Sequence, residues 1–255
     1  MDHHTLAAIS ISGTCLDVLG SLYLAYDLLG GQHGPLRLLT RAVTYSIIFG
    51  LGYGLGLGLT FGLAAGIASG VTIAVELNRI SRGLPHFSLP WEVFFATIRA
   101  AGFGVALYWL LGRSGPALGF AVTFAVLVAV GTSVAYWRGL RPGIDYGRFR
   151  DSPRPRLSQR QVVGTLVRTL GYLAAAAICS ALFDQGGENW SFALRMGLVT
   201  GLTTGILQLA IPFIEYYADK MPERRMGAVG IGLILCGFTL QSVQYWLQLL
   251  DVKVT

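Results

Sequence analysis

Charged side chains are scarce in this chain. Of its 255 residues, 13% are Asp, Glu, Lys or Arg, and the mean hydropathy is +0.59. A soluble domain carries about 25% charged residues, so the composition excludes an ordinary soluble protein. The formal net charge of +6 does not indicate a nucleic-acid partner, because membrane proteins collect Lys and Arg in their cytoplasmic loops for topological reasons.

Residues that carry redox, metal or nucleophilic chemistry are equally few. The three cysteines, Cys15, Cys179 and Cys236, lie in apolar stretches without CxxC or Cys/His spacing, which excludes a disulfide framework and a structural zinc site. All four histidines lie in predicted loops or the N-terminal tail, so an intramembrane serine would have no histidine base. HExxH, P-loop and nucleotide fingerprints are absent. We therefore expect no enzyme, no catalytic residue and no metal site, and the sequence assigns no cofactor.

The longest uncharged run lies between Arg41 and Glu76 and holds 34 residues. A single helix of that length would measure about 50 Å at 1.5 Å per residue, against a hydrocarbon core of roughly 30 Å. We therefore expect two membrane-spanning helices that turn back between Gly54 and Gly58. One long tilted helix over 36–80 is the alternative, and it would give seven spans in total.

Hydropathy along the chain predicts an all-α polytopic integral membrane protein with eight transmembrane helices. The predicted helices span residues 6–29, 36–53, 58–80, 91–112, 116–138, 159–183, 190–218 and 226–250. We expect one membrane domain overall, divided into helices 1–5 (1–138), a basic linker (139–158) and helices 6–8 (159–255).

Basic residues are distributed unevenly between the two sides of this topology. Sixteen of the 19 lysines and arginines follow the first, third, fifth and seventh helices, and the other side keeps Arg113, Arg195 and Lys253. The positive-inside rule then places the basic loops in the cytoplasm and both termini outside. The seven-helix alternative places 14 basic residues on one side of the membrane and five on the other. We expect the bacterial cytoplasmic membrane.

The linker is the only long polar segment, and its prolines and serines indicate irregular structure. Its arginines fix topology, and they would also attract anionic lipid headgroups at about 1 kcal/mol per basic residue. We expect the lipid bilayer as a partner, with a homo-oligomer or other membrane subunits as further candidates and no nucleic acid.

A weak internal repeat connects three predicted hairpins. Arg41, Arg99 and Arg168 each lie near the start of a hairpin, and an aromatic residue follows four positions later, Tyr45, Phe103 and Tyr172 respectively. Few positions match otherwise, so coincidence is a competing interpretation.

Polar residues inside apolar helices are functional candidates, because burying them in lipid is costly. Asp17 lies near the middle of the first helix, and Gln208, Gln241 and Gln244 lie within the last two helices. A protonatable carboxyl beside amide groups would bind a cation or relay a proton. The competing interpretation is that Asp17 hydrogen-bonds across a helix interface, where Gly13 and Gly20 favour close packing.

Four further charges lie at predicted helix ends, Glu76, Arg79, Arg195 and Glu215. Glu76 with Arg79, and Glu215 with Lys220, would form interfacial ion pairs, with a gating role as the alternative. Arg195 would extend outward or pair with a carboxylate at the neighbouring turn.

Glycines recur every four residues in the uncharged run, which is typical of close helix packing. The residues of this face are Gly50, Gly54, Gly58, Gly62, Gly66 and Gly70. The sequence leaves open whether glycine faces bind helices of the same chain, another subunit, or flat ligands such as pigments and quinones.

Two function classes follow from these features. The first is a small transporter or channel component that moves an ion or small solute, and the second is a non-catalytic structural or assembly subunit of a larger membrane complex. A permeation path should gather polar residues on one shared face, whereas a scaffold should leave glycine-lined grooves facing outward. The cost of retaining Asp17 favours transport.

Overall fold

The computed structural model describes residues 3–28, 36–82, 88–140, 157, 159–183, 189–220 and 223–249. These residues form helices joined by turns, with no strand among them. The helices are α1 (His3–Leu28), α2 (Arg37–Leu57), α3 (Leu59–Ser81), α4 (Leu89–Leu110), α5 (Gly115–Trp137), α7 (Gln159–Phe183), α8 (Asn189–Lys220) and α9 (Glu223–Leu249). All eight are long and apolar enough to cross a membrane, which confirms the all-α polytopic fold.

The uncharged run folds as a hairpin. Helix α2 ends at Leu57 and α3 begins at Leu59. The residue between them, Gly58, has φ 95°, in the left-handed region that glycine adopts at little cost. The alternative of one long helix over 36–80 is therefore wrong, and the eight-helix prediction is confirmed.

Exposed tryptophans mark the ends of three helices. Trp91 and Trp109 lie near the two ends of α4, Trp137 is the last residue of α5, and Trp190 is the second residue of α8. Indole rings favour the headgroup level of a bilayer, so these positions fit insertion of the helices into a membrane.

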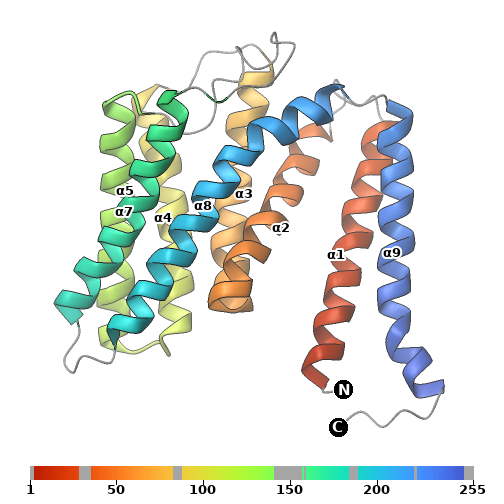
Figure 1. Cartoon of the computed structure of the whole chain (residues 1–255), viewed down its shortest axis with the longest axis horizontal. Coiled ribbons are helices and arrows are strands. Elements are labelled where there is room, and N and C mark those ends of the chain that lie inside the picture. The colour runs from red at the N-terminus through yellow and green to blue at the C-terminus, as the bar shows by residue number, and fades with distance from the viewer. Residues whose placement is uncertain are drawn as a thin grey trace. The chain divides into compact units, whose positions relative to one another are not determined.

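Contacts group the chain into two compact units (Figure 1). The terminal unit comprises residues 1–40 and 219–255 and contains α1 and α9, and the six-helix unit comprises 41–218. Helices from both sides of the predicted linker belong to the six-helix unit. The linker itself, 139–158, lies almost entirely outside the described residues.

In the terminal unit, α1 and α9 run antiparallel and side by side (Figure 1). Gly13 lies opposite Gly237, and Gly20 lies opposite Gly230. A Cβ built on Gly20 would be 2.5 Å from the carbonyl oxygen of Gly230, so the two backbones approach as closely as glycine allows.

In the six-helix unit, three hairpins, α2–α3, α4–α5 and α7–α8, form a closed ring of neighbours. A glycine lies at each junction and meets a short side chain or a backbone at all of them except α5–α7, where Gly119 meets the ring of Phe183. The junctions are Gly66 with Gly50 (α3–α2), Gly102 with Ala68 (α4–α3), Gly104 with Ala125 (α4–α5), Gly119 with Phe183 (α5–α7), Gly201 with Thr169 (α8–α7) and Gly52 with Thr203 (α2–α8).

The predicted glycine face lies mainly at the α2–α3 junction. Gly50 and Gly54 of α2 meet Gly62 and Gly66 of α3, and Gly70 packs on the backbone of Ser46. Gly58 takes no part in this packing because it forms the turn. These glycines therefore contact helices of the same chain.

Aromatic side chains fill the centre of the ring. Tyr53, Phe61, Phe103, Phe124 and Tyr172 are all buried. The ring centroids of Tyr53 and Phe103 lie 5.3 Å apart, and those of Phe103 and Tyr172 lie 5.5 Å apart, both edge-to-face. The interior of the six-helix unit is a packed core of rings contributed by α2, α3, α4, α5 and α7.

The glycine packing predicts a position-specific effect of one added methyl group. In Gly66→Ala, the new Cβ would lie 2.5 Å from Gly50 Cα and 2.6 Å from its nitrogen, so the helices must separate. We expect a loss of about 1–3 kcal/mol in the free energy of unfolding, measured as a lower melting temperature of the purified protein in detergent. Gly232→Ala is the matched control, because a Cβ there meets nothing within 4 Å. Equal melting temperatures for the two variants would contradict the packing role.

Candidate functional site

A buried ion pair connects α2 and α8 at one end of the six-helix unit. Arg41 of α2 and Glu215 of α8 are 7% and 4% exposed, and Arg41 Nη2 pairs with Glu215 Oε2. Arg41 Nε also donates to Oε1 over 3.2 Å, so the guanidinium holds the carboxylate through two parallel contacts. This two-pronged geometry is the strongest form of an Arg–carboxylate interaction.

Two hydroxyl groups complete the surroundings of this pair. The Tyr45 hydroxyl donates to Glu215 Oε1 over 2.7 Å, and Arg41 Nη1 donates to Ser81 Oγ over 3.0 Å. Tyr45 follows Arg41 by four residues, so both side chains leave the same face of α2. The cluster of Arg41, Tyr45, Ser81 and Glu215 thereby joins three helices through charged hydrogen bonds.

The other two arginines of the sequence repeat lie at the same end of the unit and meet at Tyr136. Arg99 Nη2 donates to the Tyr136 hydroxyl over 2.8 Å, and the Arg168 guanidinium lies over the Tyr136 ring, 5.2 Å from its centroid. Glu76 of α3 interacts electrostatically with Arg99. Arg99 and Arg168 are 9% and 7% exposed. We call the end that carries Arg41, Arg99 and Arg168 the basic end.

The repeat that is weak in sequence is regular in space. Each arginine is buried, and so is the aromatic residue four positions later. Two of the arginines contact the second helix of the preceding hairpin in the ring: Arg41 pairs with Glu215 of α8, and Arg168 lies over Tyr136 of α5. Arg99 instead donates to Tyr136 of its own hairpin, with Glu76 of α3 as an electrostatic neighbour, so the three hairpins share the buried Arg–aromatic pair but not one set of partners.

Helix α8 presents a polar stripe to the interior. Thr200, Thr204, Gln208 and Glu215 recur at spacings of four, four and seven residues, which places them on one helix face. All four are buried. Within the described residues, Gln208 Oε1 is buried without a hydrogen-bond partner.

Hydroxyl groups from two further helices meet this stripe. The Tyr53 hydroxyl lies 2.9 Å from Thr204 Oγ1. Tyr172 of α7 also interacts with Thr204, and Tyr53 interacts with Ser69 of α3. A buried polar path thus follows α8 from the tyrosines at Thr204, past Gln208, to the ion pair at Glu215.

The predicted site residues are divided between the terminal unit and the six-helix unit. Asp17 Oδ2 accepts a hydrogen bond of 2.7 Å from Gln241 Nε2, between α1 and α9 of the terminal unit. Gln208 belongs to the six-helix unit. The side chain of Gln244 lies outside the described residues. The observed contact of Asp17 is a hydrogen bond across a helix interface, flanked by the glycine contacts described above.

The predicted interfacial charges have the following described partners. Glu215 pairs with Arg41, while the side chain of Lys220 lies outside the described residues. Arg195 is exposed, and its Nε donates to the carbonyl oxygen of Gly56 at the end of α2 over 3.0 Å. Glu76 interacts electrostatically with Arg99, and its pairing with Arg79 stays a prediction.

No protein-family model, curated protein or solved structure matches the chain. The assignment of a function therefore depends on the geometry of this polar interior.

Sequence reasoning did not select Arg41, Tyr45, Tyr53, Tyr136 or Thr204 as site residues. The available signal was the Arg–aromatic spacing, which singled out the three arginines. Tyr53 and Thr204 carry no comparable signal, because isolated Tyr and Thr are common in apolar helices. Only the packing of α2 against α8 brings them together.

The ion pair predicts strong coupling between two residues far apart in the chain. Glu215→Gln leaves the Arg41 guanidinium buried without its carboxylate, so we expect a loss of about 3–5 kcal/mol in stability, and Arg41→Gln should cost a similar amount. The double variant should cost clearly less than the sum of the two. Melting temperatures in detergent measure all three, with Arg113→Gln, at an exposed arginine, as the control. Additive losses would contradict direct pairing.

Proposed function

We propose that the protein is a small integral membrane transporter or channel component that moves an ion or small polar solute through the interior of the six-helix unit. The observation that carries the proposal is the polar stripe of α8, Thr200, Thr204, Gln208 and Glu215, which is buried inside a ring of apolar helices. Burying such groups within a membrane is costly, and their usual use is a pathway for ions or substrates.

Several features of this interior support a pathway rather than simple packing. Gln208 Oε1 has no described hydrogen-bond partner, although it lies between Thr204 and Glu215 on the same helix face. An unsatisfied buried amide costs about 1–3 kcal/mol, which a transported solute or water would offset. Tyr53 and Tyr172 both interact with Thr204, between Thr200 and Gln208 in the stripe. Opening of these contacts would connect the part of the stripe from Gln208 to Glu215 with its Thr200 end.

Alternating states are a natural consequence of the hairpin ring. Helix α8 meets α2 through glycine contacts near its start and through the Arg41–Glu215 pair near its end. Breaking and remaking the charged contact would let the end of α8 move against α2 while the glycine contacts persist. We propose that the ion pair closes the basic end of the path.

The alternative, a non-catalytic structural or assembly subunit, requires small-residue grooves that face outward. Gly131 and Gly171 are exposed at one such groove, between α5 and α7, but most glycines of the six-helix unit pack against neighbouring helices of that unit. This distribution supports the transporter over the subunit. A homo-oligomer, partner subunits and headgroup binding at the linker stay predictions.

The proposal predicts that water reaches the stripe in some state of the protein. We would replace Cys15, Cys179 and Cys236 by Ala and then introduce Thr204→Cys or Gln208→Cys. A water-soluble thiosulfonate reacts with the thiolate, which forms readily only in contact with water. We expect both positions to react at least about tenfold faster than Ile206→Cys, which lies on the opposite face of α8 and is 63% exposed to the surroundings of the helix bundle.

The readout is the labelled fraction against time, measured by mass spectrometry of protein labelled in native membranes. If Thr204→Cys and Gln208→Cys react as slowly as Ile206→Cys, the stripe stays dry and the transport proposal fails.

A further inference from the structure

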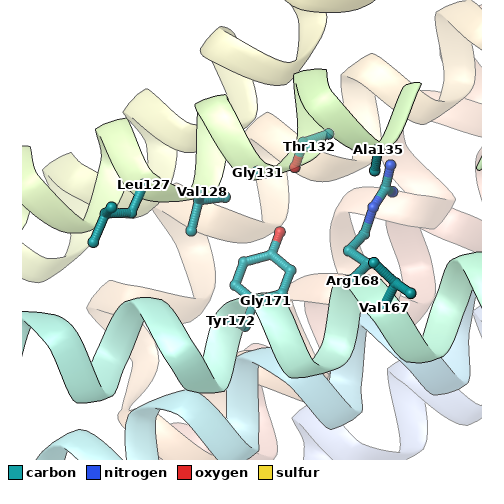
Figure 2. A pocket seen from close by; sticks show the side chains of 9 residues that line it. All are labelled: Leu127, Val128, Gly131, Thr132, Ala135, Val167, Arg168, Gly171 and Tyr172. Atoms are coloured by element: carbon teal, nitrogen blue, oxygen red, sulfur yellow. The ribbon is translucent and has the colours of Figure 1, made fainter. Parts of the chain in front are cut away.

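A groove lies between α5 and α7 on the outside of the six-helix unit (Figure 2). Its volume is about 140 Å³, close to that of cavities that hold a benzene-sized ligand. Leu127, Val128 and Gly131 line it from α5, and Arg168, Gly171 and Tyr172 line it from α7. We call it the α5–α7 groove.

Arg168 differs from the other two arginines of the repeat in its hydrogen bonds. Arg41 holds Glu215 and Ser81, and Arg99 donates to Tyr136. In the part of the chain that the structure describes, Arg168 Nε and Nη2 are buried without a hydrogen-bond partner. A buried guanidinium with free donors favours an oxyanion such as phosphate, which accepts two parallel hydrogen bonds.

The charged end of the groove lies near the end of α5. Figure 2 shows the Arg168 guanidinium beside Ala135, and α5 ends two residues later at Trp137. Trp137 is 69% exposed, and the Arg138 guanidinium lies over its ring, 5.6 Å from the centroid. An exposed tryptophan next to an arginine marks the level of lipid headgroups. The unpartnered N–H groups of Arg168 therefore lie close to the level of the lipid phosphate groups.

Besides Arg168, the lining carries the hydroxyl groups of Thr132 and Tyr172; its other residues are apolar, and the groove leads toward the middle of the membrane (Figure 2). Leu127 lies eight residues before Ala135 on α5, about 12 Å deeper at 1.5 Å per residue. Gly131 and Gly171 are exposed on the facing helices, and a Cβ built on either meets nothing within 4 Å. The missing side chains leave space on the lipid-facing side, where an acyl chain would fit.

We propose that the α5–α7 groove binds one bilayer phospholipid with an anionic headgroup. The phosphate accepts hydrogen bonds from Arg168, and an acyl chain packs against Gly131 and Gly171. A free phosphate would use the guanidinium alone, but it would leave the apolar length of the groove empty. A phospholipid would occupy both the guanidinium and the apolar length of the groove. The inference does not depend on transport, because a subunit without transport activity would bind the same lipid.

The test uses the full-length protein, purified in detergent and depleted of lipid. Native mass spectrometry with added phosphatidylglycerol should give one tightly retained lipid per chain, and phosphatidylcholine should be retained at least about tenfold more weakly. Arg168→Gln should remove the preference for phosphatidylglycerol. Gly171→Leu and Gly131→Leu, which fill the groove without touching the charge, should reduce retention by a similar factor.

Matched controls separate the groove from general effects. Arg113→Gln removes an exposed arginine stacked on Trp109, and Gly232→Leu adds the same side chain at an open glycine of α9. Both should bind phosphatidylglycerol like the original protein. Phosphatidylglycerol should also raise the melting temperature of the original protein more than that of the Arg168 and Gly171 variants, which checks that those variants are folded.

Three results would overturn the proposal. Retention unchanged in both Arg168→Gln and Gly171→Leu would exclude the groove. Loss in Arg168→Gln but not in either leucine variant, with inorganic phosphate displacing the lipid, would indicate a site for a free anion. Equal retention of phosphatidylglycerol and phosphatidylcholine would show that the charge of Arg168 does not select the lipid.

Discussion

The cost of placing charge inside a membrane protein governs the six-helix unit. Burying an arginine within a membrane protein is costly, and Arg41 meets two acceptors, Glu215 and Ser81, while the Tyr45 hydroxyl donates to the same carboxylate. Those partners come from three helices, and their geometry fixes how the start of α2, the end of α3 and the end of α8 meet. The same constraint recurs at Arg99, which donates to the Tyr136 hydroxyl and interacts electrostatically with Glu76. At Arg168 the described contacts leave donors free, and that difference leads to the lipid proposal.

Close packing supplies the second constraint, and it acts over the remaining length of the helices. Without a hydrophobic driving force between helices in lipid, contact area has to come from close backbone approach. Glycines provide it at the junctions of the ring, while large rings such as Phe103 and Tyr172 fill the space that the ring encloses. The result is a unit that is tightly packed where it is apolar and held by specific charged contacts at its basic end.

Helix number and the turn at Gly58 were predictable because they follow from local quantities, namely the length of uncharged runs and the thickness of a bilayer. The close packing of Gly50 and Gly66 also follows from local spacing. Partners across the fold were not predictable. Local spacing pointed to Lys220, five residues after Glu215, whose side chain lies outside the described residues; it did not point to Arg41, 174 residues away, which the carboxylate meets, because helix periodicity defines faces but not neighbours. For Asp17 the sequence offered an ion site or a hydrogen bond across a helix interface; the observed contact is the hydrogen bond from Gln241 of α9, whereas Gln208, grouped with them by depth, lies in the other unit.

The most direct test of a conducting interior is flux through the purified protein in liposomes, followed with dyes for protons, chloride and potassium. We expect flux of at least one of these ions above that of protein-free liposomes, and a fall of about tenfold or more when Thr204→Val and Gln208→Leu remove the polar groups of the stripe. Thr97→Val is the matched control, because Thr97 is exposed and its hydroxyl bonds only the carbonyl oxygen of Val93 in its own helix. Two results would contradict the account. One is an ion flux that is the same in the stripe variant, the Thr97 variant and the original protein. The other is the absence of flux from folded protein.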